Sequence, residues 1–330
     1  MDRTYRKLAV KFYNIKKISA LMKFIFRLIS KKYIIHFYNN LGSKRLWIVL
    51  SLLPVNNIIM HERGSSWNVS STKKKIVLKN SRKAKLIIAN SQASKELLIQ
   101  KFGLDGGKIK VIYNGFLGDH IKYSKQVKNK QFTVGFIGRL DSPKGVEVLI
   151  KAAKKLIKYK FKIAGNGPLK NFLISESNSF DNIEFVGRVN NPYNFINNID
   201  LLVVPSVREP LGNVIIEAGF LKKPVIASCV DGIPELITDN ESGILLMPKC
   251  ELDKNFDGTL KHPEYVINGI TKKLDQPKNI DYLELSNTIE ELADDRKKRE
   301  FLSNNLNKKV LKNCKLVNYF NQLENVYNTF

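Results

Sequence analysis

Short apolar runs rich in β-branched residues, each followed by a polar turn and a helix-like stretch, recur along this 330-residue sequence. Strands of this length that alternate with helical patterns are typical of a parallel sheet covered by helices. The second half of the chain shows the pattern most regularly, with expected strands at Phe132–Ile137, Lys160–Ala164, Ile183–Val186, Leu201–Pro205 and Pro224–Ala227, and expected helices from Pro143 and from about Asn213. We therefore predict an α/β fold.

The same alternation occupies the first half, with expected strands at Tyr33–Phe37, Ile58–Met60, Leu86–Ala89 and Lys110–Tyr113. A chain of this length can bury two cores. We expect a first domain over residues 1–121, a second domain over residues 122–310 that opens with a polar Lys-rich linker, and a C-terminal helix over residues 311–330. Residues 250–280 break the rhythm and are interpreted as an insertion in the second domain.

The net charge of +25 is concentrated in residues 1–130, which hold 28 Lys and Arg against five acids. The remaining 200 residues hold 27 Lys and Arg against 25 acids. Such a field attracts phosphates on nucleic acid, on anionic lipid or on a lipid-linked substrate. A solvated Lys-rich surface is the alternative. We expect residues 1–130 to make a peripheral contact with an anionic membrane, and we expect no nucleic-acid partner because the sequence lacks an RNP, helix-turn-helix or zinc signature.

Residues 4–32 carry apolar side chains at helical spacing with Lys and Arg between them. This pattern predicts either a basic helix on a membrane surface or a core helix of the first domain. No apolar run is long enough to span a bilayer, and no signal-peptide cleavage site is apparent. Cys229, Cys250 and Cys314 show no pairing pattern, as is typical of reduced thiols. We expect a cytoplasmic location, with peripheral attachment to the inner face of the plasma membrane as one form of it.

The first strand of the second domain is followed by the turn GRLDSPKG, which begins at Gly138. Ser142 suits a helix N-cap, and Pro143 suits the first helical turn. Such a turn lies at the carboxyl edge of a parallel sheet, where α/β proteins bind ligands. Arg139 and Lys144 bracket the turn, so both cations are placed to contact one diphosphate. Two surface cations on an ordinary turn are the alternative.

Glycines follow the next two strands, in the segments AGNGP and FVGRV. Glycine allows a ligand to approach the backbone closely. Gly165 and Gly167 are therefore candidate ligand-binding residues, and Arg188 is expected to flank a base. An ordinary loop is the alternative for Gly-Asn-Gly.

Two glutamates flank a predicted helix start in the segment PSVREPLGNVIIEA. Glu209 follows a strand, and Glu217 lies about one turn inside the next helix. The backbone amides of Gly212, Asn213 and Val214 lie between them and form a helix N-terminus, which favours an anion. Carboxylates are good acceptors for sugar and ribose hydroxyls. The segment predicts a diphosphate site with an acceptor on each side.

Taken in order, these motifs resemble the C-terminal domain of glycosyltransferase family 4, a group of retaining enzymes with the GT-B fold of two Rossmann-like domains. The resemblance covers Val134–Pro248 and includes the family's G-R-L…K-G, G-x-G-P, F-x-G-R, P-S…E-x7-E, K-P-V-I-A-S and G-x-P-E-L…G-I-L segments. Ala84–Ser91 and Val111–Gly115 also match the family's first domain, and the last helix resembles one that crosses back onto that domain.

The resemblance implies roles for individual residues. In the family, the Arg and Lys that match Arg139 and Lys144 hold the leaving diphosphate. The glutamate that matches Glu209 contacts the donor sugar, and the one that matches Glu217 contacts the ribose. His61 resembles an active-site histidine beside the transferred sugar, with a structural histidine as the alternative. The candidate donor-binding residues are Gly138, Gly165, Gly167, Arg188, Gly212, Asn213, Val214 and Glu217.

The resemblance further implies retaining transfer from a nucleoside diphosphate sugar, with neither metal nor cofactor, and the absence of a D-x-D motif agrees. The expected acceptor is a glycan or a lipid-linked molecule, in synthesis of a cell-surface polysaccharide or lipopolysaccharide. Three alternatives stay open: a nucleotide-sugar-binding pseudoenzyme or partner-dependent subunit, a phosphorylase or epimerase on the same fold, and a basic nucleic-acid-binding protein.

Three features depart from the family pattern. Fewer residues precede the strand at Tyr33 than is usual, and no glycine occurs before Gly42. We therefore predict a shortened N-terminal domain without the usual Gly-rich loop, which places the acceptor side in question. Asp231 stands where a glycine is usual, and Lys222 stands where the family often has a small residue.

Overall fold

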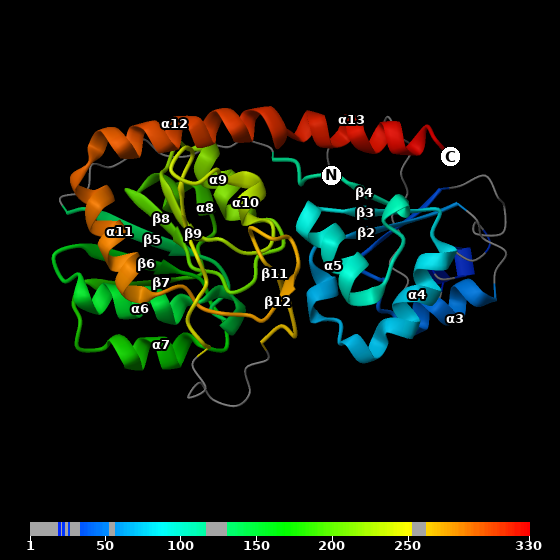
Figure 1. Cartoon of the computed structure of the whole chain (residues 1–330), viewed down its shortest axis with the longest axis horizontal. Coiled ribbons are helices and arrows are strands. Elements are labelled where there is room, and N and C mark those ends of the chain that lie inside the picture. Colours follow the sequence, from blue (N-terminus) through cyan, green and yellow to red (C-terminus); the bar gives the residue numbers. More distant parts are fainter. Residues whose placement is uncertain are drawn as a thin grey trace.

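The computed structural model describes residues 34–52, 57–116, 131–252 and 262–330, with a few residues between 19 and 26. Two α/β domains lie side by side, each built on its own parallel sheet (Figure 1). The predicted α/β fold is therefore confirmed. The predicted helix over residues 4–32 and the predicted linker over residues 122–131 lie almost wholly outside the described residues.

The N-terminal sheet has four parallel strands among the described residues, in the order β1-β2-β3-β4. These are β1 (Ile35–Tyr38), β2 (Ile58–Glu62), β3 (Leu86–Ala89) and β4 (Ile109–Val111). The helices between them are α3 (Lys44–Ser51), α4 (Lys74–Lys83) and α5 (Gln92–Phe102). Local chemistry sets their ends: Ser43 and Ser91 cap α3 and α5 with their side chains, and Gly103 ends α5 in the left-handed region.

The two faces of this sheet are covered by different parts of the chain. One face packs Met60 and Ile87 against apolar side chains of α3, α4 and α5. On the other face, Ile59 and Ile88 pack against the last helix, α13 (Leu316–Tyr327). The helix α12 (Arg296–Asn313) precedes α13, and together the two helices run along both domains (Figure 1).

The C-terminal sheet has six parallel strands in the order β10-β9-β8-β5-β6-β7. Its strands are β5 (Thr133–Ile137), β6 (Lys160–Ala164), β7 (Ile183–Gly187), β8 (Leu201–Val204), β9 (Val225–Ser228) and β10 (Ile244–Leu246). This is the doubly wound order of a Rossmann-like domain, in which the chain returns to the first strand and continues on its other side. The switch point lies between β5 and β8.

Helices cover both faces of the C-terminal sheet. Apolar residues of α6 (Val146–Lys155), α7 (Lys170–Ser177) and α11 (Tyr282–Asp294) pack on one face. The other face is covered by α8 (Pro192–Asn197), α9 (Asn213–Phe220), α10 (Ile233–Leu236) and α12. The predicted helix start at Pro143 differs from the structure. Residues Ser142–Lys144 form a 3-10 helix, and α6 begins after Gly145, whose φ of +62° closes that turn.

The segment interpreted as an insertion contributes an antiparallel hairpin, β11 (Val266–Ile267) and β12 (Leu274–Asp275). This hairpin lies between the two domains beside α5 (Figure 1). Ile267 and Leu274 pack against Trp67, Ala93 and Leu97 of the N-terminal domain. The hairpin therefore belongs to the interface that holds the domains together.

Candidate functional site

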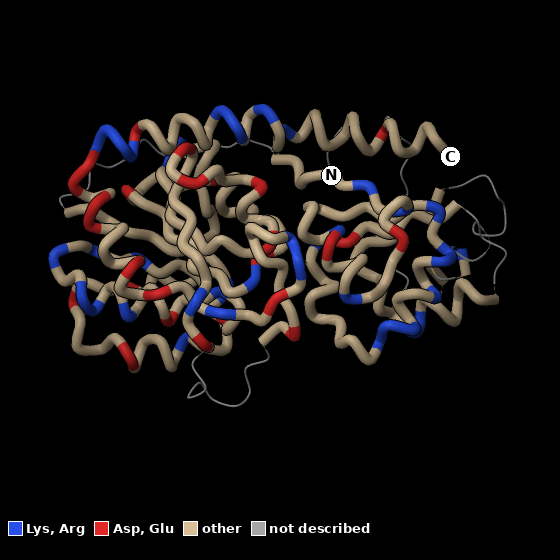
Figure 2. The backbone as a smooth tube through the Cα atoms, viewed as in Figure 1, with Lys and Arg blue, Asp and Glu red and all other residues tan. Residues whose placement is uncertain are grey.

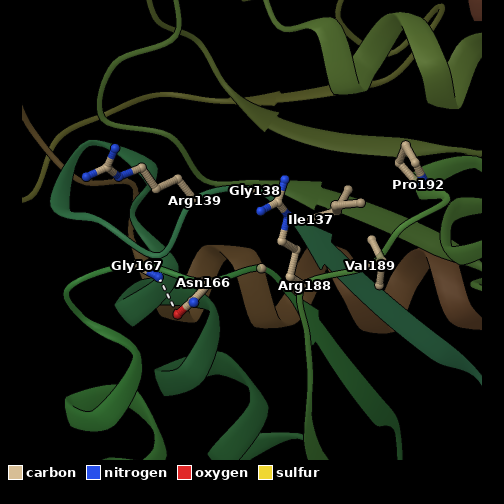
Figure 3. A pocket seen from close by; sticks show the side chains of 9 residues that line it. Ile137, Gly138, Arg139, Asn166, Gly167, Arg188, Val189 and Pro192 are labelled. Carbon is tan, nitrogen blue, oxygen red and sulfur yellow. Dashed lines mark hydrogen bonds between the residues drawn. The ribbon is translucent and has the colours of Figure 1, made fainter.

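The carboxyl ends of β5, β6 and β7 open onto a cavity of about 750 Å³, beside the switch point of the sheet (Figure 3). Small-molecule sites commonly have this volume, and this position is where doubly wound sheets bind ligands. The cavity is lined by Ile137, Gly138, Arg139, Gly165, Asn166, Gly167, Arg188, Val189 and Pro192. Five of the predicted donor-side residues, Gly138, Arg139, Gly165, Gly167 and Arg188, therefore share one cavity.

The glycines of this cavity are required by the packing of one turn on another. A Cβ at Gly165, where φ is +145°, would lie 1.8 Å from the carbonyl oxygen of Gly138. A Cβ at Gly167 would lie 2.2 Å from the carbonyl oxygen of Leu140. Backbone hydrogen bonds join the same turns, because the Gly138 N–H donates to Ala164 at 3.0 Å and the Leu140 N–H donates to Asn166 at 3.0 Å. Glycine thus permits the neighbouring backbone to form the cavity wall.

Two arginines supply positive charge around the cavity. The Arg188 side chain rises beside Gly138, whereas Arg139 extends away from it (Figure 3). Arg139 is 69% exposed, and its Nε lies 3.0 Å from Oδ2 of Asp141. An exposed ion pair of this kind contributes little to stability. The Arg139 guanidinium is therefore available to an anionic ligand at small energetic cost, and Arg188 is an exposed residue of the same cavity.

Lys144 and Glu209 form an ion pair next to this cavity. The Nζ of Lys144 donates to Oε2 of Glu209 at 2.5 Å, and the side chains are 26% and 11% exposed. The turn that carries Lys144 packs directly on the chain leading to Glu209, since a Cβ at Gly145 would lie 2.0 Å from the carbonyl oxygen of Pro205. The structure thus brings together two residues that the sequence separates by 65 positions. Arg139 and Lys144 each contact a different carboxylate, Asp141 and Glu209, and their shared contact with a diphosphate stays a prediction.

The helix α9 begins immediately after the Glu209 loop. Gly212 precedes it with φ of +98°, and no side chain caps the amides of its first turn. The N-terminus of α9 is therefore open to an anion. The Asn213 side chain contacts the N-terminal domain, because Nδ2 of Asn114 donates to its Oδ1 at 2.8 Å. Val214, the remaining predicted amide donor, is half-buried in the same turn.

Glu217 lies on α9, near Tyr193 of α8. Burial raises the pKa of its carboxyl to about 7. Burial also raises the pKa of the Tyr193 hydroxyl, and the nearby Glu217 charge raises it further. Near pH 7, a carboxyl with this pKa is partly protonated in the free protein. Hydroxyl donors from a ligand would stabilise its anionic form.

His61 is buried within β2, on the face of the N-terminal sheet covered by α13. Its ring stacks at 5.3 Å from that of His36 and at 5.0 Å from that of Tyr38. The side chain is 0% exposed, and neither ring nitrogen has a partner among the described residues. Burial lowers the pKa of His61 to about 3, with smaller effects from His36 and Arg63. His61 is therefore neutral, and its expected place beside the transferred sugar stays a prediction.

The end of β2 nevertheless contacts the Glu209 loop. Gly64 has φ of +99°, and a Cβ there would lie 2.5 Å from Cγ of Pro210. The hydroxyl of Ser91 donates to the carbonyl oxygen of Pro210 at 2.6 Å. A second contact between the domains is made by Glu235 of the C-terminal domain, which accepts from the N–H groups of Gln92 and Ala93 at 2.8 Å each. Both domains therefore hold the loop that carries Glu209.

Three further residues near the site lie outside the sequence-based predictions of function. The buried Asp231 accepts from the backbone N–H of Glu209 at 2.9 Å. The guanidinium of Arg208 donates to Oδ1 of Asn68 in the N-terminal domain at 2.5 Å. His262 lies 2.7 Å from the hydroxyl of Ser142, which was predicted as a helix cap. Only Asp231 carried a signal in the sequence, as a substitution for a usual glycine; its φ of +47° shows why glycine suits this position.

Comparison with known proteins agrees with this geometry. A family model described as "Glycosyl transferases group 1" matches residues 131–257, and one described as "Glycosyltransferase Family 4" matches residues 22–116. The capsular polysaccharide biosynthesis glycosyltransferase CapM of Staphylococcus aureus is 26% identical over 271 residues, covering 79% of this chain and 60% of CapM. The O-antigen biosynthesis glycosyltransferase WbnH of Escherichia coli is 31% identical over 190 residues, covering 55% of this chain and 54% of WbnH. The chain thus spans little more than half the length of these relatives.

Solved structures share the fold. Anabaena Alr3699/HepE in complex with UDP-glucose aligns with a TM-score of 0.75 at 20% identity, covering 100% of this chain and 90% of that one. Sucrose-phosphate synthase of Thermosynechococcus elongatus aligns with a TM-score of 0.72 at 20% identity, covering 97% and 80%. These structures have the GT-B fold, in which two Rossmann-like domains face one another. With matching family models in both domains, and with related glycosyltransferases among its relatives, the chain belongs to glycosyltransferase family 4.

Proposed function

We propose that this protein is a retaining glycosyltransferase that moves a sugar from a nucleoside diphosphate sugar to a glycan or lipid-linked acceptor. The observation that carries the proposal is the Lys144–Glu209 pair, which lies beside an open helix N-terminus and a cavity lined by Arg139 and Arg188. The related CapM and WbnH are named for capsule and O-antigen synthesis, so we propose a cell-surface polysaccharide as the pathway product. A cytoplasmic location is part of the same proposal.

The charges around the pair suit a leaving diphosphate. When the bond between the anomeric carbon and the phosphate oxygen breaks, negative charge grows on the diphosphate. Lys144 and Arg139 would offset this charge, and such fixed groups stabilise a transition state because they need no reorganisation. Glu209, released from Lys144 by the incoming phosphate, would accept hydrogen bonds from the sugar hydroxyls. The acceptor oxygen bonds to the same face of the anomeric carbon, and its proton passes to the departing phosphate.

The proposed step needs no metal ion and no cofactor from the protein. Among the described residues, no group of three or more His, Cys, Asp or Glu side chains is arranged to hold a metal. The two arginines and Lys144 supply the positive charge instead. Retention and metal independence are proposals, and transfer assays with EDTA and stereochemical analysis of the product would test them.

Substitution of the ion pair tests the proposed function. We expect Lys144→Ala and Glu209→Ala each to lower the rate of transfer by about 100-fold or more, the usual effect of removing one electrostatic stabiliser. The exposed pair of Lys154 and Glu176 in the same domain is a matched control, with 3.2 Å between Nζ and Oε2. Alanine at either control position should leave transfer unchanged. Full activity of either site variant would refute the assignment, and donor binding without transfer by the wild type would indicate a binding subunit.

The acceptor-side partner that we propose is an anionic membrane surface. Residues 34–116 hold 14 Lys and Arg against three acids. Neither α3 nor α4 contains an acid; α3 begins with Lys44 and Arg45, and Lys and Arg recur along α4 (Figure 2). Ile48 of α3 and Leu52, which follows this helix, are 45% and 78% exposed. Apolar side chains flanked by cations suit a peripheral contact with anionic lipid. Within the described part of the chain, no helix is long and apolar enough to cross a bilayer.

A further inference from the structure

Asp231 is a buried carboxyl group, whose pKa burial raises to about 7, in a backbone conformation that L-residues rarely adopt. It follows β9, its φ is +47°, and its side chain is 0% exposed. A buried carboxylate is costly unless it is hydrogen-bonded, and left-handed backbone at a non-glycine residue adds to the cost. Where a fold keeps both costs at one residue, a functional constraint is a natural explanation.

The carboxylate of Asp231 holds the backbone of two segments that are far apart in sequence. Its Oδ2 accepts from the N–H of Glu209 at 2.9 Å, and its Oδ1 accepts from the N–H of Ile267 at 2.7 Å. The backbone of the same turn completes the contact, since the Gly232 N–H donates to the carbonyl oxygen of Glu209 at 3.1 Å. Both polar groups of the Glu209 backbone are therefore fixed by this turn.

The second segment connects the same carboxylate to the N-terminal domain. Ile267 belongs to the hairpin of β11 and β12, and its side chain packs against Trp67 and Leu97. Gln100 on α5 donates to the carbonyl oxygen of Lys272 at 2.8 Å and accepts from the N–H of Leu274 at 2.9 Å. One buried carboxylate thus links the Glu209 loop to a hairpin that is docked on the other domain.

We infer that Asp231 is a positioning residue, which orients Glu209 toward the donor sugar and fixes that orientation relative to the N-terminal domain. This inference rests on the proposed function. Asp231 itself has both oxygens occupied by backbone N–H groups, so it acts through Glu209. Loss of its carboxylate should allow the Glu209 side chain to move away from its hydrogen bond with Lys144. The cavity at the ends of β5, β6 and β7 should keep its shape.

The variants Asp231→Asn and Asp231→Gly test the inference. Asparagine keeps the shape but can accept through only one oxygen, and glycine removes both acceptors while relieving the left-handed backbone. We expect transfer to fall at least tenfold in both, with UDP affinity within about twofold of wild type. In the Glu209→Ala background, Asp231→Asn should cause no further loss of transfer. Equal loss of UDP affinity and transfer, or wild-type transfer in both variants, would overturn the inference.

Asp200→Asn is the matched control, because Asp200 accepts from the N–H of Thr133 at 2.9 Å at the opposite end of the same sheet. It should lower stability without a selective loss of transfer. A readout independent of activity separates this inference from the proposed function. Asp231→Asn should accelerate amide hydrogen exchange at both Glu209 and Ile267, and Asp200→Asn should not. Unchanged exchange at these two amides would overturn the inference even if the protein were an active transferase.

Discussion

Alanine at Gly165 should damage the donor cavity far more than alanine at Gly187, although both glycines end neighbouring strands with positive φ. At Gly187, φ is +69° and a Cβ would meet nothing within 4 Å. The cost there is the left-handed backbone alone, about 1–2 kcal/mol. At Gly165, the Cβ would lie 1.8 Å from the Gly138 carbonyl oxygen, whereas real Cβ atoms essentially never approach within 3.0 Å. Overpacking of this kind adds roughly 1–3 kcal/mol.

The functional consequence follows from the required movement. The backbone at Gly138 must shift by about 1 Å to restore normal contact, and Gly138 leads directly into Arg139. Misplacement by this distance can cost about 100-fold in rate. We therefore expect Gly165→Ala to lose about 100-fold in transfer and roughly 2–5 kcal/mol in stability. Gly187→Ala should retain transfer within a few-fold.

Guanidinium unfolding and steady-state transfer with a saturating acceptor measure the two quantities. UDP binding by calorimetry measures the cavity directly, because it does not depend on the acceptor. If the two alanine variants lost stability and donor binding equally, contact between the β5 and β6 turns would not shape the cavity, and the explanation for the glycine would fail.

Two further predictions concern charge. Because burial raises the pKa of Glu217 from 4.5 to about 7, its contribution to stability is fully present below pH 4.5 and is lost as the pH rises to 7. In urea unfolding, the free energy of unfolding of Glu217→Gln should thus equal that of wild type at pH 4.5 and exceed it at pH 8 by up to about 3 kcal/mol. The variant should also bind nucleotide more weakly. Equal stability of variant and wild type at both pH values would contradict the assigned burial penalty. Replacing Lys75, Lys79 and Arg82 of α4 by Glu should lower cosedimentation with anionic vesicles at least tenfold, whereas Glu at Lys297, Lys308 and Lys312 of α12 should not. Unchanged vesicle binding, or preferential binding of oligonucleotides at matched salt, would exclude α4 as a membrane contact.

The strands of the second domain were predictable because each can be identified from the residues that it contains. The apolar run at Leu201–Val204 is buried in all four residues and needs no distant partner to be identified as a strand. The short strand β10 was missed, since three residues, Ile244–Leu246, carry too little pattern. The helix at Pro143 was misplaced for a different reason. The closing turn depends on contact between Gly145 and Pro205, which lies in a loop 60 residues away.

The residue types of the site were predictable, but their pairing was not. The motifs placed Arg139 and Lys144 at one turn, and their spacing could not show that each has its own carboxylate. For His61, the residue pattern predicted the strand but not the face of the sheet that the side chain occupies. In a strand, one position changes the face, and the face of His61 is covered by a helix from the far end of the chain.

Direct measurement of donor binding is the sharpest test of the central claim, which is that the switch point of the C-terminal domain binds a nucleoside diphosphate sugar. Thermal unfolding with UDP-, GDP-, ADP- and dTDP-sugars, followed by calorimetry on the best ligand, makes that measurement. A ligand at about 100 times its Kd adds roughly 2.7 kcal/mol to stability. We expect one nucleotide family to stabilise the wild type, and Lys144→Ala to abolish that effect without changing the unliganded Tm by more than a few degrees. No stabilisation by any of the four, or the same stabilisation in Lys144→Ala, would contradict the account.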